Sequence, residues 1–127
     1  MSSQQVLAHG MEIAAIEEAP SLDGRDESDV PPFTGAEVAY ARSKSDPQRR
    51  LAARLAAKRA AAKALGGDLP LAAFEVAPAR GGPPRLLLSA AGEARLRAIG
   101  GTAVLLSLTH GRTHAAAAVV VLGRRSP

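Results

Sequence analysis

The stretch from Pro47 to Gly67, PQRRLAARLAAKRAAAKALGG, decides the fold of this chain. Alanine, leucine, arginine and lysine, which have the highest helix propensities, make up most of it. A proline at the start and two glycines at the end, Gly66 and Gly67, stand where helix termini favour them. The stretch therefore predicts one long helix over residues 48–65.

The spacing of apolar residues predicts which side of this helix faces the core. At about 100° per residue, four of them share one arc: Leu51, Leu55, Ala62 and Leu65. Lys58 falls inside the arc and Arg54 at its edge, although a buried ammonium is costly unless an anion compensates it. Two interpretations lead, and contact of this basic helix with a nucleic-acid backbone is a third that no motif supports. Either the Lys58 stem packs while its charged head reaches water, or Lys58, Arg54 and Lys63 bind phosphate.

The composition of the chain excludes several classes of function. Its 127 residues are 46% hydrophobic, enough for one packed domain. Aromatic residues make up only 2%, which excludes a stacking platform for single-stranded nucleic acid. Cysteine is absent, which excludes disulfides, thiolate zinc sites and a cysteine nucleophile. Without a membrane-length apolar run or a signal-peptide pattern, we expect a cytoplasmic protein that binds neither membrane nor nucleic acid.

Charge is distributed unevenly along the chain. Residues 1–40 carry eight Asp or Glu and one Arg, for a net charge of −7. Residues 41–127 carry fifteen Lys or Arg and four Asp or Glu, for a net charge of +11. Such an asymmetry indicates either an anionic partner for the second part of the chain or a solvated basic surface.

The segments on either side of the long helix complete a domain over residues 1–127. We expect a strand over 6–16, then an acidic loop over 17–32 that is rich in turn residues. A short helix over 33–40 would begin with a capping box, Thr34 with Glu37. After the long helix, four strands and one helix are expected: strands 73–76, 85–88, 104–108 and 115–122, and a helix at 89–99. This order predicts an α+β fold with an antiparallel sheet packed on one long helix and shorter helices.

The long helix also carries a family resemblance. ARLAAKRA (53–60), followed by KALG (63–66), resembles the signature G-R-F-A-A-K-E-A…K-A-x-G of holo-acyl-carrier-protein synthases, which are small 4′-phosphopantetheinyl transferases. Four further segments resemble family motifs in the same order: HGMEI (9–13), FT…E…Y (33–40), FEV…GPP (74–84), and SLTH with the small-residue strand after it (107–122).

This resemblance implies a fold and an activity. The fold would be that of the 4′-phosphopantetheinyl transferases, commonly assembled as a homotrimer with coenzyme A between subunits. Magnesium would hold the coenzyme A pyrophosphate while 4′-phosphopantetheine moves to a serine of an acyl carrier protein or carrier domain, in fatty acid or polyketide biosynthesis. The residues implied to bind coenzyme A are Arg54, Lys58, Lys63 and His110. Arg59, which stands where the family has a glutamate, is expected to add a fixed positive charge near the pyrophosphate. Lys63 and Glu12 would serve catalysis, and Glu12 would also bind the metal.

The chain departs from the family pattern at both metal-binding positions. Glu12 replaces an aspartate, and a longer carboxylate can still ligate magnesium. Arg59 replaces a glutamate, and a guanidinium repels a cation instead of ligating it. The acidic loop 17–32 also stands where the family has a basic helix that contacts the carrier protein.

Three functions remain open. The first is a transferase with an altered metal site. The second is a non-transferase on the same scaffold that acts on or holds carrier-bound acyl intermediates. The third is a structural or regulatory subunit without a ligand. All three are possible on one scaffold, because a fold alone does not determine a function.

Overall fold

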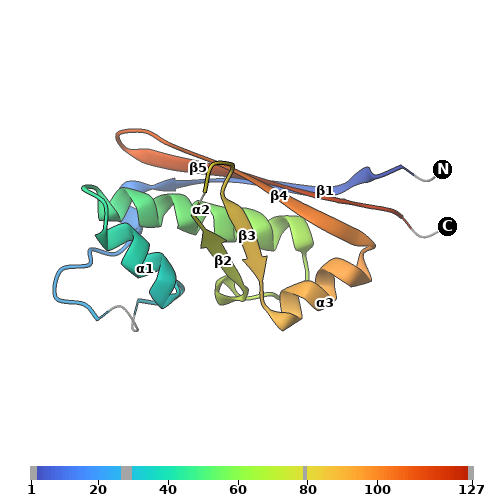
Figure 1. Ribbon diagram of the computed structural model, residues 1–127, viewed down its shortest axis with the longest axis horizontal. Helices are drawn as coiled ribbons and strands as arrows, with labels where there is room; N and C mark the ends of the chain where they lie inside the picture. The colour runs from blue at the N-terminus through green and yellow to red at the C-terminus, as the bar shows by residue number, and fades with distance from the viewer. Residues whose placement is uncertain (1–2, 27–29, 79, 126–127) are drawn as a thin grey trace.

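The computed structural model describes residues 3–26, 30–78 and 80–125, and these form an α+β fold (Figure 1). Its elements in chain order are β1 (Gln5–Ala15), the 3-10 turn η1 (Ile16–Glu18), α1 (Gly35–Arg42), α2 (Pro47–Leu65), the 3-10 turn η2 (Leu71–Ala73), β2 (Phe74–Ala77), β3 (Arg85–Leu88), α3 (Ala90–Ala98), β4 (Gly101–His110) and β5 (His114–Gly123). The expected helices and strands are therefore confirmed within a few residues, and η1 lies at the start of the expected acidic loop. None of the described helices is long and apolar enough to cross a membrane.

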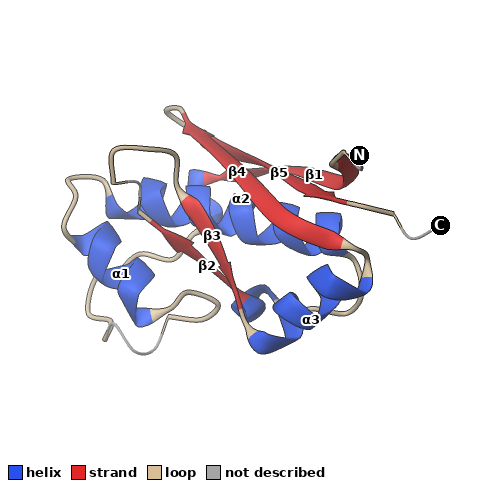
Figure 2. Ribbon diagram, turned by 45° about the vertical axis from the view of Figure 1, so that its right-hand side comes forward, coloured by secondary structure: helices blue, strands red, loops and turns tan. Residues whose placement is uncertain are grey.

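The strands form two separate antiparallel sheets. One has the order β1-β5-β4, and the other is the hairpin of β2 and β3. Figures 1 and 2 show α2 running along one face of the three-stranded sheet, with α1 near one end of α2 and the hairpin beside it. The first and last strands of the chain pair with each other, from Gln5 opposite Gly123 to Ala15 opposite His114.

Helix α2 is buried on almost every side. Buried alanines also lie outside the expected core arc: Ala52, Ala53, Ala56, Ala57, Ala60, Ala61 and Ala64. The expectation of a single core face was too narrow, because α2 packs against both the sheet and the elements on its other side, α1 and β2. Small side chains let these neighbours come close to the helix backbone.

Strand β1 comes close to the α2 backbone at Gly10. A Cβ atom placed on Gly10 would stand 2.3 Å from the carbonyl oxygen of Ala60 and 3.1 Å from the backbone nitrogen of Ala64. Only a residue without a side chain fits at this distance. This contact brings the following residues of β1, including Glu12, against the last turns of α2.

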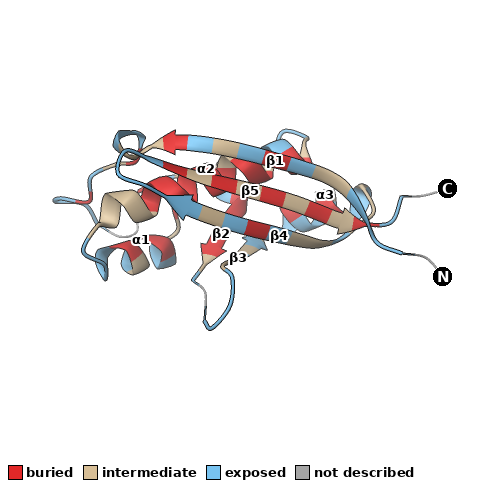
Figure 3. Cartoon of the chain, turned by 90° about the horizontal axis from the view of Figure 1, so that it is seen from above, coloured by how far each residue is buried: buried red, intermediate tan, exposed pale blue. Residues whose placement is uncertain are grey.

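The other face of the three-stranded sheet is open. Val119 and Val121 point toward α2 and are fully buried, whereas Met11, Ile13 and Leu105 on the other face are 66%, 63% and 54% exposed. Figure 3 looks down on this face, and none of the described helices lies over it. The sheet thus presents an apolar surface that the described residues leave uncovered.

Candidate active site along helix α2

Lys58 lies in the core, which corrects both interpretations of its charge. Its side chain is 0% exposed, and its ammonium stands 2.8 Å from Oε1 of Glu37 and donates to the carbonyl oxygen of Phe74. The Glu37 carboxylate also accepts from the backbone N–H groups of Thr34, at 2.9 Å, and Val76, at 2.8 Å. The anion that compensates Lys58 is therefore a buried carboxylate of the chain itself. The Lys58 ammonium neither reaches water nor faces a surface where phosphate could bind.

Arg54 is also turned inward. The residue is 4% exposed, and its guanidinium lies 4.3 Å from the centroid of the Tyr40 ring. Nη1 donates to the carbonyl oxygen of Arg50 at 3.2 Å, while the buried Nε has no hydrogen-bond partner. Burial lowers the pKa of Arg54 below its ordinary value, against the opposing influence of Tyr40 and Glu37. Arg54 thus connects α1 to α2 and presents little surface to a ligand.

The two remaining candidate cations of α2 are accessible and lie one turn apart. Nη1 of Arg59 stands 2.9 Å from Oε1 of Glu18, with side-chain exposures of 33% and 41%. The Lys63 ammonium pairs with Glu12, with exposures of 58% and 26%, and also donates to the carbonyl oxygen of Met11 at 3.3 Å. The structure therefore brings together three predicted site residues, Glu12, Arg59 and Lys63. It adds Glu18, for which the only sequence signal was its place in the acidic loop.

Glu18 is held in place from two directions. The backbone N–H of Ala15 donates to Oε2 at 2.7 Å, and Arg59 holds Oε1. Together these donors lower the pKa of Glu18 below its ordinary value of 4.5, the backbone hydrogen bond contributing most, and the charge of His114 acts in the same direction. Glu18 is therefore an ionised counter-charge for Arg59.

His110 and His114 flank the β4–β5 turn. His110 ends β4 opposite Ala115 and is exposed. His114 begins β5 beside Ala15, and its Nδ1 lies 2.8 Å from Oγ1 of Thr113. Of the two histidines, His114 contributes to the lowered pKa of Glu18.

These residues do not fit a magnesium ion. The Glu12 carboxylate is paired with Lys63, and a guanidinium occupies the helix position where a second carboxylate would be needed. Within residues 3–26, 30–78 and 80–125, no group of three or more His, Cys, Asp or Glu could hold a metal. Glu12 as a metal ligand thus gains no support from the geometry.

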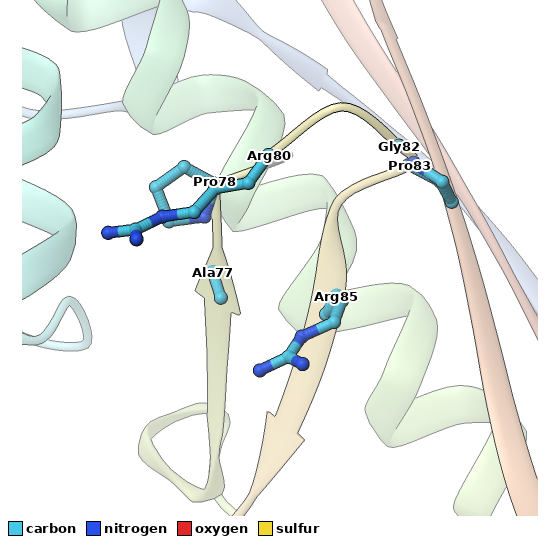
Figure 4. Close-up of a pocket in the computed structure, with 6 residues that line it drawn as sticks. All are labelled: Ala77, Pro78, Arg80, Gly82, Pro83 and Arg85. Atoms are coloured by element: carbon cyan, nitrogen blue, oxygen red, sulfur yellow. The ribbon is translucent and has the colours of Figure 1, made fainter.

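A cavity lies at the turn of the β2–β3 hairpin. Its volume is about 550 Å³, within the usual range for small-molecule sites. Arg80, Gly82, Pro83 and Arg85 line it, and Figure 4 shows the two arginine side chains extending to the same side of the hairpin. The predicted strands 73–76 and 85–88 imply a turn between them, but neither arginine was predicted as a site residue, although their positions on either side of the glycine-proline segment were a usable signal.

The chain is similar to known proteins of one family. No model of a protein family matches it, and the similarity is to individual proteins. It is 39% identical over 92 residues to the holo-[acyl-carrier-protein] synthase of Moorella thermoacetica, and the matched region covers 70% of this chain and 72% of that protein. It is 43% identical over 81 residues to the protein of the same name from Nitratidesulfovibrio vulgaris, covering 61% and 65%.

A solved structure agrees with these relatives. The ACPS–CoA complex of Chronobacterium ammoniagenes matches 98% of this chain and 100% of that one, with a TM-score of 0.73 and 26% identity. Sequence relatives and fold agree, and we conclude that the chain belongs to the holo-[acyl-carrier-protein] synthase family.

Proposed function

We propose that this protein transfers 4′-phosphopantetheine from coenzyme A to a serine of an acyl carrier protein. The observation that carries the proposal is the accessible pair of cations on α2, Arg59 and Lys63, beside the carboxylate of Glu12. It is supported by the names of the relatives and by the coenzyme A complex of a family member. The same names favour a transferase over a protein that only holds acyl intermediates.

The proposed reaction displaces one half of a pyrophosphate. The serine oxygen bonds to the phosphorus that carries pantetheine, the bond from that phosphorus to the bridging oxygen breaks, and 3′,5′-ADP leaves. Lys63 would stabilise the negative charge that develops on the leaving oxygen. Glu12, released from Lys63 by the incoming phosphate, would accept the serine proton.

The rest of coenzyme A needs a longer surface than these residues provide. We propose that its nucleotide end reaches the β2–β3 cavity of a second copy of the chain, where Arg80 and Arg85 can pair with phosphate, because this hairpin lies beside β4, at the opposite edge of the sheet from β1 and Glu12. His110 at the end of β4 stays a predicted contact. Lys58 and Arg54 would act from inside, by fixing α2 against its neighbours.

The partners are proposed on charge and exposure. The basic part of the chain, 41–127, suits an acidic carrier protein of fatty acid or polyketide biosynthesis. The cytoplasm is the proposed location.

The uncovered apolar face around Met11, Ile13 and Leu105 would be covered by further copies of this chain in a homotrimer. Size-exclusion chromatography with light scattering tests the assembly. Ile13→Glu should yield monomers, and a monomeric parent protein would contradict the trimer.

Intact mass spectrometry tests the activity. Apo-acyl carrier protein incubated with coenzyme A and this protein should gain the mass of one phosphopantetheine. Lys63→Met should abolish the gain, while Arg50→Gln, a matched removal of positive charge from the other end of α2, should not. Binding of coenzyme A without any mass gain, in EDTA or in magnesium, would refute the transferase.

A further inference from the structure

The site beside β1 contains fixed positive charges where a divalent cation would be expected. Arg59 and Lys63 are neighbours on one side of α2, and each is held by one carboxylate, Glu18 or Glu12. Both cations remain partly exposed, so a ligand can reach them from solvent. The two carboxylates are already occupied by these cations, and none of the four groups is left to hold a metal.

A guanidinium can provide much of what a cation provides to a pyrophosphate. It stays positively charged at all physiological pH values, and its planar fork of N–H donors matches two phosphate oxygens. The carboxylate of Glu18 now occupies the donor Nη1 of Arg59. Because a phosphate oxygen has the same charge and the same acceptor chemistry, it can take the place of that carboxylate.

We propose that Arg59, with Lys63, binds the pyrophosphate of coenzyme A directly, without a divalent cation, and that Glu18 is the internal anion that the pyrophosphate displaces. This inference rests on the proposed function, because it concerns the same ligand. Glu18 is suited to the exchange since it is already ionised, held by the Ala15 N–H, and exposed to solvent. When the ligand leaves, Glu18 returns to Arg59, so the guanidinium is never left without a counter-charge.

Calorimetric titration with coenzyme A in EDTA and in magnesium chloride tests the proposal. The parent protein should bind with dissociation constants that agree within about threefold in the two buffers. A threefold ratio corresponds to less binding free energy than one charge-assisted hydrogen bond contributes. Arg59→Gln should weaken binding in EDTA by about tenfold or more, the loss expected for hydrogen bonds to a charged group. Glu18→Gln should tighten binding by about two- to fivefold, because the ligand no longer competes with an exposed ion pair.

Arg50→Gln is the matched control. Arg50 lies on the same helix, is paired with Asp46 at 3.1 Å, and has a 31% exposed side chain, close to the 33% of Arg59. It lies nine residues, about 14 Å along the helix axis, from Arg59. Its loss should change the dissociation constant by less than about threefold, which separates a specific contact from the general field of the helix. Far-UV circular dichroism should show all variants folded.

The possible outcomes distinguish failure of the metal-free site from failure of the proposed transferase function. Tight binding only in magnesium, or equal affinity of Arg59→Gln and the parent in EDTA, would overturn the metal-free site and leave the transferase function standing. An unchanged affinity of Glu18→Gln would overturn the exchange with Glu18. No binding in either buffer would overturn the proposed function and this inference with it.

Discussion

Lys58→Met should destabilise the protein severely, although it replaces a buried charge with an apolar side chain. Methionine keeps most of the lysine stem but leaves the Glu37 carboxylate in the core without its cation. Breaking a buried ion pair by removing one partner costs about 3–5 kcal/mol. Since single domains are stable by about 5–15 kcal/mol, this one substitution would remove a large share of the total.

Urea unfolding followed by far-UV circular dichroism measures the loss, since the chain contains no Trp and one Tyr. Lys63→Met is the matched control, a lysine of the same helix in an exposed ion pair, and it should cost no more than about 1 kcal/mol. The double variant Lys58→Met with Glu37→Gln should regain at least about 1 kcal/mol relative to the sum of the single variants, because no charge remains buried alone.

A Lys58→Met protein as stable as the parent, or more stable, would refute this reasoning. That result is the one expected if the anion of Lys58 were a bound phosphate, because removing a lone buried cation would then relieve the unliganded protein. The sign of the stability change therefore decides whether Lys58 belongs to the core or to the ligand site.

Three further predictions concern the packing and electrostatics of α2. Gly10→Ala should lower thermal stability by about 1–3 kcal/mol, since its Cβ would meet the Ala60 oxygen at 2.3 Å, and an unchanged melting temperature would contradict this contact. The pKa of Glu18 is lowered on folding, so its stabilising contribution is full above its ordinary value of 4.5 and is lost as pH falls through the folded value. Glu18→Gln should therefore flatten the acid limb of a stability-against-pH curve, and an unchanged limb would count against the pair. Arg95→Met should cost about 1.5 kcal/mol by removing the donor 2.7 Å from the carbonyl oxygen of Leu65, seen as faster hydrogen exchange in the last turn of α2, and equal exchange rates would argue against this cap.

Local sequence signals were sufficient for most of the elements. Pro47 and Gly66 mark the ends of α2, and the predicted capping box is present, since Thr34 Oγ1 accepts from the Glu37 N–H at 3.2 Å and Glu37 accepts in return. These features depend on residues a few positions apart. The division of the strands into two sheets was not predictable, because a strand pattern does not specify which strand is its neighbour.

The candidate site was predictable only where the family resemblance indicated which segments of the chain serve one site. Glu12 and Lys63 belong to separate motifs, and in the structure the Lys63 ammonium pairs with the Glu12 carboxylate. The role of Lys58 was missed, because its partner Glu37 lies 21 residues away on another helix. The spacing of apolar residues predicts only that a residue is buried, and does not identify its partner. Nothing in the local sequence of Glu37 distinguishes a capping residue from the anion of a buried ion pair.

The small side chains around α2 constrain how this interior can change. In a core built from large residues, the usual damaging substitution removes atoms, and the neighbours partly collapse into the space. The buried alanines of α2 have only one methyl group to lose, whereas a larger side chain would have to displace the neighbours that bury it. Mutational scanning should therefore find glycine and serine tolerated better than valine or leucine at these positions. Enlarging one of them would require a compensating displacement of a whole neighbouring element rather than of a single side chain.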